Sequence, residues 1–192
     1  LETLIILSKD EDLDIIESVA KNPNIPIDVL TTLSKDKNWY VRKCVALNSN
    51  TPIDILTTLS KDTDFDVRVG IAQNPNTLKD ILIGLSKDRN YHVRYNVAKN
   101  LKTPSGILEI LSEDNKTEVR RSIAWNPKTP TNILIKLSED SEWEIRNEVA
   151  RNFNTPIETL IKLSKDKDDY VKKNAIKTLE QKDKELNIKI DN

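Results

Sequence analysis

The sequence has little of several residue types, and each shortage excludes a class of protein. Its 192 residues include one cysteine, no methionine and three glycines. A single thiol, Cys44, excludes an internal disulfide framework and any site that needs several cysteine ligands for zinc or an iron–sulfur cluster. No apolar run approaches the ~20 residues of a membrane span, and no signal segment opens the chain. We therefore expect a soluble, cytoplasmic protein with no membrane partner.

The chain also lacks an excess of charge of either sign. Thirty Lys and Arg stand against 31 Asp and Glu, which argues against a general polyanion-binding protein. Hydrophobic residues make up only 37% of the chain, and charged residues make up 32%. A compact globule of this composition would have a thin core, so we expect an elongated fold with much surface.

A strict internal repeat of 26 residues runs through the sequence. An asparagine column has this spacing, at Asn22, Asn48, Asn74, Asn100, Asn126 and Asn152. The predicted units are 1–24, 25–50, 51–76, 77–102, 103–128, 129–154 and 155–180, in one domain over 1–180, with 181–192 as a C-terminal cap or tail. Because the first unit begins inside its leading helix, we expect the sequence to be an excerpt of a longer chain.

Each unit is predicted to contain two short helices. In the third unit, Thr51 is placed to cap the first helix, Pro52 to open it and Asp54 to occupy its first turn. A residue such as Asp64 caps the second helix, and Asn74 suits a left-handed turn after it. Helices this short do not persist alone, so each must bury its apolar face against neighbouring units. The predicted fold is a helical solenoid.

The string N-P-x-T-P-x-x-I-L-x-x-L-S-x-D-x-D-x-x-V-R-x-x-V-A recurs through residues 1 to about 180. It resembles the variant leucine-rich repeat, and its Asp-to-Val-Arg spacing resembles HEAT repeats. The resemblance implies an all-α, right-handed α-α superhelix of about seven two-helix units that serves as an interaction scaffold. It also allows one helix of each pair to be 3₁₀-like. The four-cysteine cluster of some family members is absent, so we carry over no iron–sulfur chemistry and predict no cofactor.

Two columns of charge follow the repeat: an arginine in the second helix, and an aspartate six residues before it. Guanidinium groups at one register could grip phosphates or acidic peptides. We favour a structural ladder of pairs within and between units, because charged groups near a core are usually paired. The predicted ladder comprises Asp36, Arg42, Asp62, Arg68, Asp88, Arg94, Asp114, Arg120, Asp140 and Arg146.

Sites for catalysis or metal binding are not predicted. The segment DTDFD at 62–66 begins like a calcium loop, but the sixth and twelfth positions, Val67 and Gln73, should be Gly and Glu. Helix-capping carboxylates are the favoured interpretation. Cys44 and His92 lie nearly two units apart, too far for a nucleophile and base in contact. We therefore predict a protein that is not an enzyme.

We expect partner recognition at positions whose residue type is not constrained by the stacking of repeats. These are the positions of the second helices that vary between units. Aromatic and apolar residues at positions predicted to be exposed mark a partner-binding strip. The strip comprises His92, Tyr95, Lys99, Arg121 and Trp125, together with Tyr40, Leu47 and Val69. The alternative is that these are ordinary surface residues that pack on neighbouring units.

The predicted function is to bind another protein or peptide along one face of the superhelix. The alternative is a HEAT-like solenoid that binds nucleic acid, since the unit 77–102 has six Lys and Arg against two Asp. End-to-end self-association is a further expectation, because the first helix is predicted to present an uncovered apolar stacking face.

Overall fold

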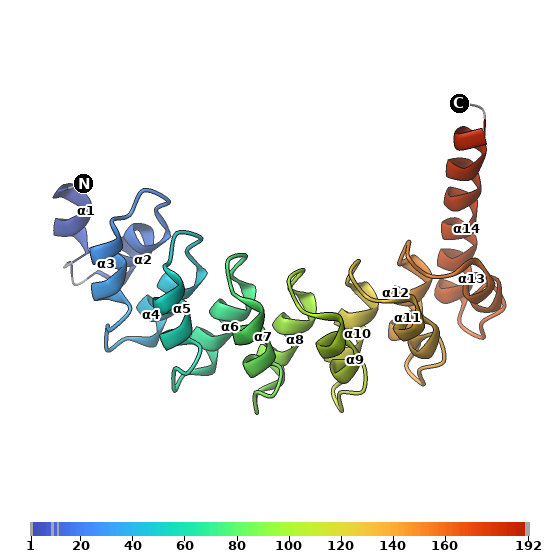
Figure 1. The fold of residues 1–192 in the computed structure, drawn as a ribbon, viewed down its shortest axis with the longest axis horizontal. Coiled ribbons are helices and arrows are strands. Elements are labelled where there is room, and N and C mark those ends of the chain that lie inside the picture. Colours follow the sequence, from blue (N-terminus) through green and yellow to red (C-terminus); the bar gives the residue numbers. More distant parts are fainter. Residues whose placement is uncertain (1, 9, 11, 191–192) are drawn as a thin grey trace. The chain divides into compact units, whose positions relative to one another are not determined.

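A computed structural model of the chain describes residues 2–8, 10 and 12–190. Every helix or strand assigned among these residues is an α-helix (Figure 1). The first helices of the repeats are α1 (Glu2–Leu7), α3 (Ile27–Leu33), α5 (Ile53–Leu59), α7 (Lys79–Leu85), α9 (Ser105–Leu111), α11 (Thr131–Leu137) and α13 (Ile157–Leu163). The second helices are α2 (Leu13–Lys21), α4 (Trp39–Leu47), α6 (Phe65–Gln73), α8 (Tyr91–Lys99), α10 (Thr117–Trp125), α12 (Trp143–Arg151) and α14 (Asp169–Ile190).

The prediction of a two-helix repeat is confirmed, with one correction. Within the described residues both helices of each pair are α-helical, so the expectation that one of them is 3₁₀-like is wrong. In the first helix of the third repeat, Leu56 and Leu59 lie on one face of an α-helix and are both buried.

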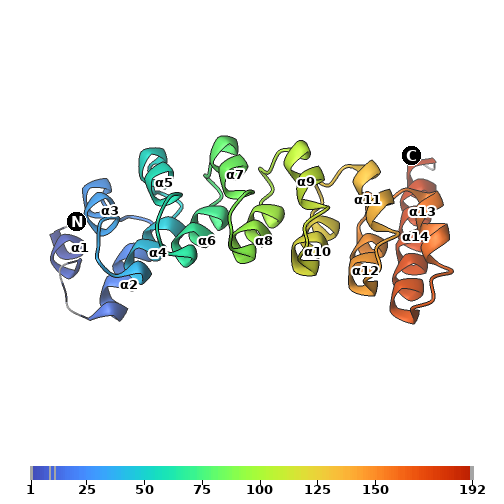
Figure 2. The same ribbon diagram turned by 90° about the horizontal axis from the view of Figure 1, so that it is seen from below.

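The helices fall into two compact units, residues 1–103 and 104–192. Within the first unit, α4 packs on α2 and α6, and α6 packs on α8. Within the second, α12 packs on α10 and α14. Figure 2 shows α3, α5 and α7 on one side of the first unit and α4, α6 and α8 on the other. The chain thus has an all-α helical-repeat fold, whereas a single domain over 1–180 stays a prediction.

The core of each repeat is a thin layer between its two helices and the next repeat. In the third repeat, Leu56 of α5 meets this layer together with Val67 and Ile71 of α6, and all three are fully buried. The helices are seven and nine residues long in this repeat. At this length an isolated helix is unstable in water, so stability comes from the burial of these faces.

The asparagine column ties each repeat to the one before it. Asn74 has φ −65° and ψ 126°, an extended conformation, so the predicted left-handed turn is wrong. Its side-chain amide instead donates to the carbonyl oxygens of Ala46 and Asn48, each at 2.8 Å. The Asn74 Oδ1 accepts from the backbone N–H of Asn76. Asn48, Asn100 and Asn152 donate to the preceding repeat in the same way.

The threonine before each first helix has a different role from the one predicted. Helix α5 begins at Ile53 with Pro52 as its N-cap, so Thr51 is not the cap and Pro52 is not the first helical residue. The Thr51 hydroxyl donates to the carbonyl oxygen of Val45, at the end of the preceding helix. The same carbonyl oxygen also accepts from the backbone N–H of Asn48, the C-cap of α4, so Thr51 adds a second bond at this helix end.

Several second helices begin with the Asp or Asn cap that the sequence predicts, whereas α10 and α12 have no side-chain cap. The side chains of Asn38, Asp64 and Asn90 each accept from the backbone N–H two residues on. The carboxylate of Asp62 accepts in turn from the N–H of Asp64, and that of Asp64 from the N–H of Asp66. The acidic segment 62–66 therefore caps a helix, in agreement with the favoured interpretation.

The last helix is longer than its counterparts. α14 runs from Asp169 to Ile190, so residues 181–190 continue this helix and do not form a separate cap. Among the described residues, no helix combines the length and the apolar character needed to cross a bilayer.

The arginine column links consecutive repeats through paired hydrogen bonds. Arg68 donates from Nε and Nη2 to the two carboxylate oxygens of Asp88, at 2.6 and 3.0 Å. Its Nη1 donates to the carbonyl oxygen of Asp62, the aspartate of its own repeat, at 2.7 Å. The same pairing to the next repeat joins Arg42 with Asp62, Arg120 with Asp140, and Arg146 with Asp166. Arg94 donates to the Asp88 carbonyl.

This pairing lowers the pKa of the paired aspartates. Burial alone raises the pKa of Asp88, but the hydrogen bonds from Arg68 and from the Asn90 N–H outweigh it, and the pKa lies below its usual value. A carboxyl whose pKa is lower in the folded state than in the unfolded state stabilises the fold above the unfolded pKa. That stabilisation is lost as the pH falls through the folded pKa.

We predict that Arg68→Gln lowers the free energy of unfolding by about 3 kcal/mol at about pH 7, because Asp88 is left buried without its partner. Urea denaturation followed by circular dichroism measures this change. The matched control is Lys162→Gln, which breaks the exposed Lys162–Glu139 pair and should cost less than ~0.5 kcal/mol. As the pH falls below about 3.9, the ordinary pKa of aspartate, the Arg68→Gln difference should shrink, since a protonated Asp88 no longer places an unpaired charge in the variant's interior. An equal difference above and below this pKa would contradict the pairing as its cause.

Close packing at Gly70 supplies a second prediction. A Cβ atom on Gly70 would lie 3.0 Å from the Cβ of Ala46 and 3.3 Å from the Lys43 carbonyl oxygen, whereas one on Gly84 meets nothing within 4 Å. Gly70→Ala should therefore destabilise the chain by about 1–3 kcal/mol through overpacking. Gly84→Ala should stabilise it by about 0.5–1 kcal/mol, because alanine favours the helix. Thermal unfolding midpoints that move in the same direction for both variants would show that the α4–α6 approach is not tight.

Candidate functional site

A groove in the second unit opens between the ends of two consecutive second helices. Its volume is about 290 Å³, and it is lined by Trp125, Pro127, Glu148, Arg151, Asn152 and Phe153. Trp125 and Arg151 are the last residues of α10 and α12, and Pro127 and Phe153 belong to the loops that follow. We call this the 125–153 groove.

An equivalent groove exists in the first unit, 52 residues earlier in the repeat register. It has a volume of about 440 Å³ and is lined by Ala72, Gln73, Pro75, Asn96, Lys99, Asn100, Leu101 and Lys102. Gln73 corresponds to Trp125, Lys99 to Arg151 and Leu101 to Phe153. We call this the 73–101 groove. A cation at the helix end and an apolar residue in the loop are common to both.

The hydrogen bonds of the asparagine column also form the floor of the 125–153 groove. Asn152 donates from its side chain to the carbonyl oxygens of Ala124 and Asn126, at 2.8 and 3.2 Å. These bonds fix the end of α12 and the loop after it against the end of α10. The groove walls are therefore anchored by the same interaction that stacks the repeats.

Two aromatic rings are exposed in the 125–153 groove. Trp125 is 51% exposed and Phe153 is 42% exposed. The ammonium of Lys182, in the long helix α14, lies 4.8 Å from the centre of the Phe153 ring. Tryptophan and phenylalanine that remain this accessible leave apolar surface that a partner can bury.

Two arginines flank the aromatic rings around a single carboxylate. Glu148 is buried, with its side chain 10% exposed. The Arg121 Nε lies 3.6 Å from one of its oxygens, and the Arg151 Nη1 lies 4.0 Å from the other. The side chains of Arg121 and Arg151 are 56% and 60% exposed. Both guanidinium groups thus point at one carboxylate and keep most of their surface in solvent.

The 73–101 groove has a neutral floor. The Gln73 side chain donates to the Oδ1 of Asn96 at 2.9 Å, and the Asn96 amide donates to the His92 carbonyl oxygen at 2.7 Å. Lys99 lies over the Tyr95 ring, 5.4 Å from its centre. Leu101 is exposed. This groove offers amides and one ammonium in place of two guanidinium groups.

The predicted strip is distributed over both units. In the first unit, His92 is exposed and its ring lies 4.1 Å from that of Tyr91, centre to centre, while Lys99 is exposed and Tyr95 half-buried. In the second unit, Trp125 lines the 125–153 groove, and Arg121 lies 3.6 Å from Glu148, which also lines it. A strip that joins these two sets stays a prediction.

The three remaining strip residues are covered to different extents. Tyr40 and Leu47 are half-buried. The expectation that Val69 is exposed is wrong, because Val69 is buried. It precedes Gly70, where α6 approaches α4 closely enough to cover its neighbours.

The ladder arginines are not available as a recognition surface. Arg42, Arg68, Arg120 and Arg146 each place Nε and Nη2 on an aspartate and Nη1 on a carbonyl oxygen. Little donor capacity is left for a ligand. Binding therefore has to use arginines outside this column.

Sequence reasoning missed Phe153 and Glu148 as site residues. It placed Arg151 among the variable positions of the second helices but did not include it in the strip. Phe153 was overlooked because the loops were treated only as connections between repeats. A signal did exist, since Phe153 and Leu101 stand in a column that elsewhere holds Pro23, Ser49, Pro75 and Pro127. Glu148 carries no such signal, because its burial between repeats depends on packing.

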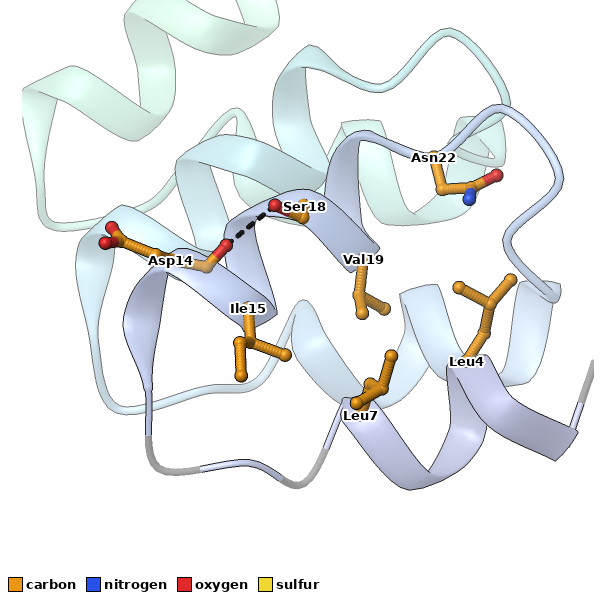
Figure 3. Close-up of a pocket in the computed structure, with 7 residues that line it drawn as sticks. All are labelled: Leu4, Leu7, Asp14, Ile15, Ser18, Val19 and Asn22. Atoms are coloured by element: carbon orange, nitrogen blue, oxygen red, sulfur yellow. Dashed lines mark hydrogen bonds between the residues drawn. The ribbon is translucent and has the colours of Figure 1, made fainter.

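A third hollow lies on the first helix pair. Figure 3 shows Leu4, Leu7, Ile15 and Val19 converging on it, from α1 and α2. Its volume is about 520 Å³. Leu4 and Leu7 are half-buried, whereas their counterparts Leu30 and Leu33 in the next repeat are buried. This hollow is therefore an apolar stacking face that is only partly covered.

Comparison with solved structures identifies the repeat type. The chain superposes on a leucine-rich repeat variant, described as having a novel repetitive structural motif, with a TM-score of 0.68 and 27% sequence identity. The match covers 93% of this chain and 71% of that one. The chain is a helical-repeat protein that resembles the variant leucine-rich repeat. The resemblance predicted from the repeated string is confirmed.

Two further solved structures are similar to the chain over most of its length. An engineered protein matches with a TM-score of 0.51 and 18% identity, over 93% of this chain and 67% of that one. A chain of the S. pombe condensin Cnd3-Cnd2 subcomplex matches with a TM-score of 0.48 and 20% identity, over 92% of this chain and 24% of that one. No protein-family profile and no curated protein matches the sequence.

Proposed function

We propose that the chain is a non-enzymatic, cytoplasmic scaffold that binds an extended segment of a partner protein in the 125–153 groove. The observation that carries the proposal is the exposure of Trp125 and Phe153 beside two accessible arginines. Tryptophan and arginine are the residues most often found to dominate interface energetics. The helical-repeat fold supports the proposal, because such folds stack repeats into extended binding surfaces.

The size of the groove favours a segment over a folded domain. A volume of about 290 Å³ lies just below the range for small-molecule pockets, about 300–1,000 Å³. It accommodates one or two side chains. A partner would therefore insert a few residues here and gain further contact area from the flanking surface.

Nucleic-acid binding is the second candidate, and it centres on the 73–101 groove. Lys99 and Lys102 line this groove, in the repeat with the largest excess of basic residues. Binding by phosphate contacts would weaken steeply as salt concentration rises. The two candidates use different grooves, so substitutions in one groove separate them.

We predict that Trp125→Ala with Phe153→Ala weakens peptide binding and leaves the fold intact. The test is a phage-display selection of random peptides on the 192-residue chain, with enriched peptides measured by fluorescence polarisation. The double variant should weaken binding at least about tenfold, since each buried aromatic ring contributes about 1–3 kcal/mol. Circular dichroism should be unchanged, because both rings are largely outside the core.

The matched control is Trp143→Ala, a residue of the same type that is exposed in the same unit and stacks on Tyr170. It should leave peptide affinity unchanged. Peptides that bind equally well to the groove variant and to the control variant would refute the 125–153 groove as the site. A selection that enriches no peptide, together with salt-dependent DNA binding lost in Lys99→Ala with Lys102→Ala, would favour the second candidate.

We also predict end-to-end self-association through the partly covered face of α1 and α2. Leu4, Leu7 and Ile15 would be buried by a second copy, and Leu7→Glu should prevent this because it places a charge in an apolar contact. Sedimentation velocity over a wide concentration range measures the association. Ile110→Glu, at an exposed position of α9, is the control. A monomer at every concentration would refute this prediction.

A further inference from the structure

We infer that the segment bound in the 125–153 groove is acidic, with a carboxylate between Arg121 and Arg151 and an adjacent apolar side chain against Trp125 and Phe153. The inference rests on the proposed function and names the chemistry of its partner. It follows from the unused N–H donors of the two arginines, from the net charge at the groove and from the positions of the Trp125 and Phe153 rings.

The chain contains arginines in two different states. In the ladder, Arg146 donates from Nε and Nη2 to both oxygens of Asp166 at 2.7 and 2.9 Å, and from Nη1 to a carbonyl oxygen. In the groove, Arg121 and Arg151 approach Glu148 only to 3.6 and 4.0 Å. These distances exceed that of a good hydrogen bond. A guanidinium has five N–H donors, so both groove arginines retain donors for a ligand.

The positive charge at the groove favours a negatively charged ligand. Two guanidinium groups share the single carboxylate of Glu148, which leaves an excess of one positive charge at the groove. Lys182, above the Phe153 ring, adds another. A carboxylate brought between the arginines would form charge-assisted, bidentate hydrogen bonds. A basic segment would be repelled.

Glu148 also orients the side chains of the two arginines. Its carboxylate is buried and lies within 4.0 Å of a nitrogen of each one. A buried carboxylate between two guanidinium groups restrains both side chains, which reduces the entropy lost when a ligand fixes them. Glu148 is therefore a positioning residue for the site and not itself a competitor that saturates it.

The rings define the second part of the ligand. Phe153 lies in the loop next to Arg151, and Trp125 ends the helix that carries Arg121. Each ring is therefore close in sequence to one arginine. A ligand with an acidic residue beside an apolar one would satisfy the guanidinium groups and cover the rings together. Nucleic acid fits this arrangement less well, because phosphate binding gains from many separate cations.

The test uses a fluorescein-labelled heptapeptide with a central phenylalanine and three glutamates on each side. The matched probe has glutamine in place of every glutamate. Fluorescence polarisation with the full chain should show at least about tenfold tighter binding of the glutamate peptide, the range expected for charge-assisted contacts. Arg121→Gln with Arg151→Gln should remove this preference. Arg89→Gln, an exposed arginine in the first unit, should retain it.

Each outcome decides the inference. Equal binding of the two peptides, or a preference that survives in the double arginine variant, would overturn it. No binding of the glutamate peptide would overturn it as well. Displacement of the glutamate peptide by duplex DNA, with the same dependence on Arg121 and Arg151, would replace an acidic protein segment by nucleic acid. Neutral peptides that still require Trp125 and Phe153 would leave the proposed function standing and refute only the acidic partner.

Discussion

The structure depends on one interaction, the hydrogen bonds from an asparagine side chain to the backbone of the preceding repeat. At Asn74 these bonds reach the carbonyl oxygens of Ala46 and Asn48. The Ala46 carbonyl lies at the end of its helix, where carbonyl groups lack intrahelical partners, and the Asn48 carbonyl accepts from Thr51 N–H as well as from Asn74. A bond to a residue 26 positions earlier also explains why the repeat length does not vary: an insertion would shift donor from acceptor.

The arginine–aspartate pairs complement these asparagine hydrogen bonds at the other end of the same helices. In α6, Arg68 pairs with Asp88 near the start of the helix, and Asn74 holds its end. A second helix fixed at both ends needs no particular residue on its outer face. The residue equivalent to Trp125 is glutamine in the third repeat and lysine in the fourth, so the outer face is free to carry binding residues.

Periodicity was sufficient to predict which positions are constrained, but not which contact constrains them. The helices, their caps at Asn38 and Asp64, and the pairing of arginine with aspartate could be derived from spacing and helix chemistry. The extended backbone of Asn74 could not, because an asparagine after a helix fits a left-handed turn equally well. The burial of Val69 depends on the absence of a side chain at Gly70 and on the neighbouring repeat. The groove depends on a loop residue, Phe153, whose exposure no helical pattern describes.

Arg120 and Arg121 show how closely structure and recognition are placed in this fold. They are consecutive residues of α10, and a helix turns by about 100° per residue. Arg120 consequently faces the next repeat, where its side chain is 17% exposed and pairs with Asp140. Arg121 faces the groove, where its side chain is 56% exposed beside Glu148. The guanidinium of Arg120 stabilises the stack of repeats, whereas that of Arg121 stays accessible. The difference arises because the two side chains point in different directions around the helix axis and so reach different partners.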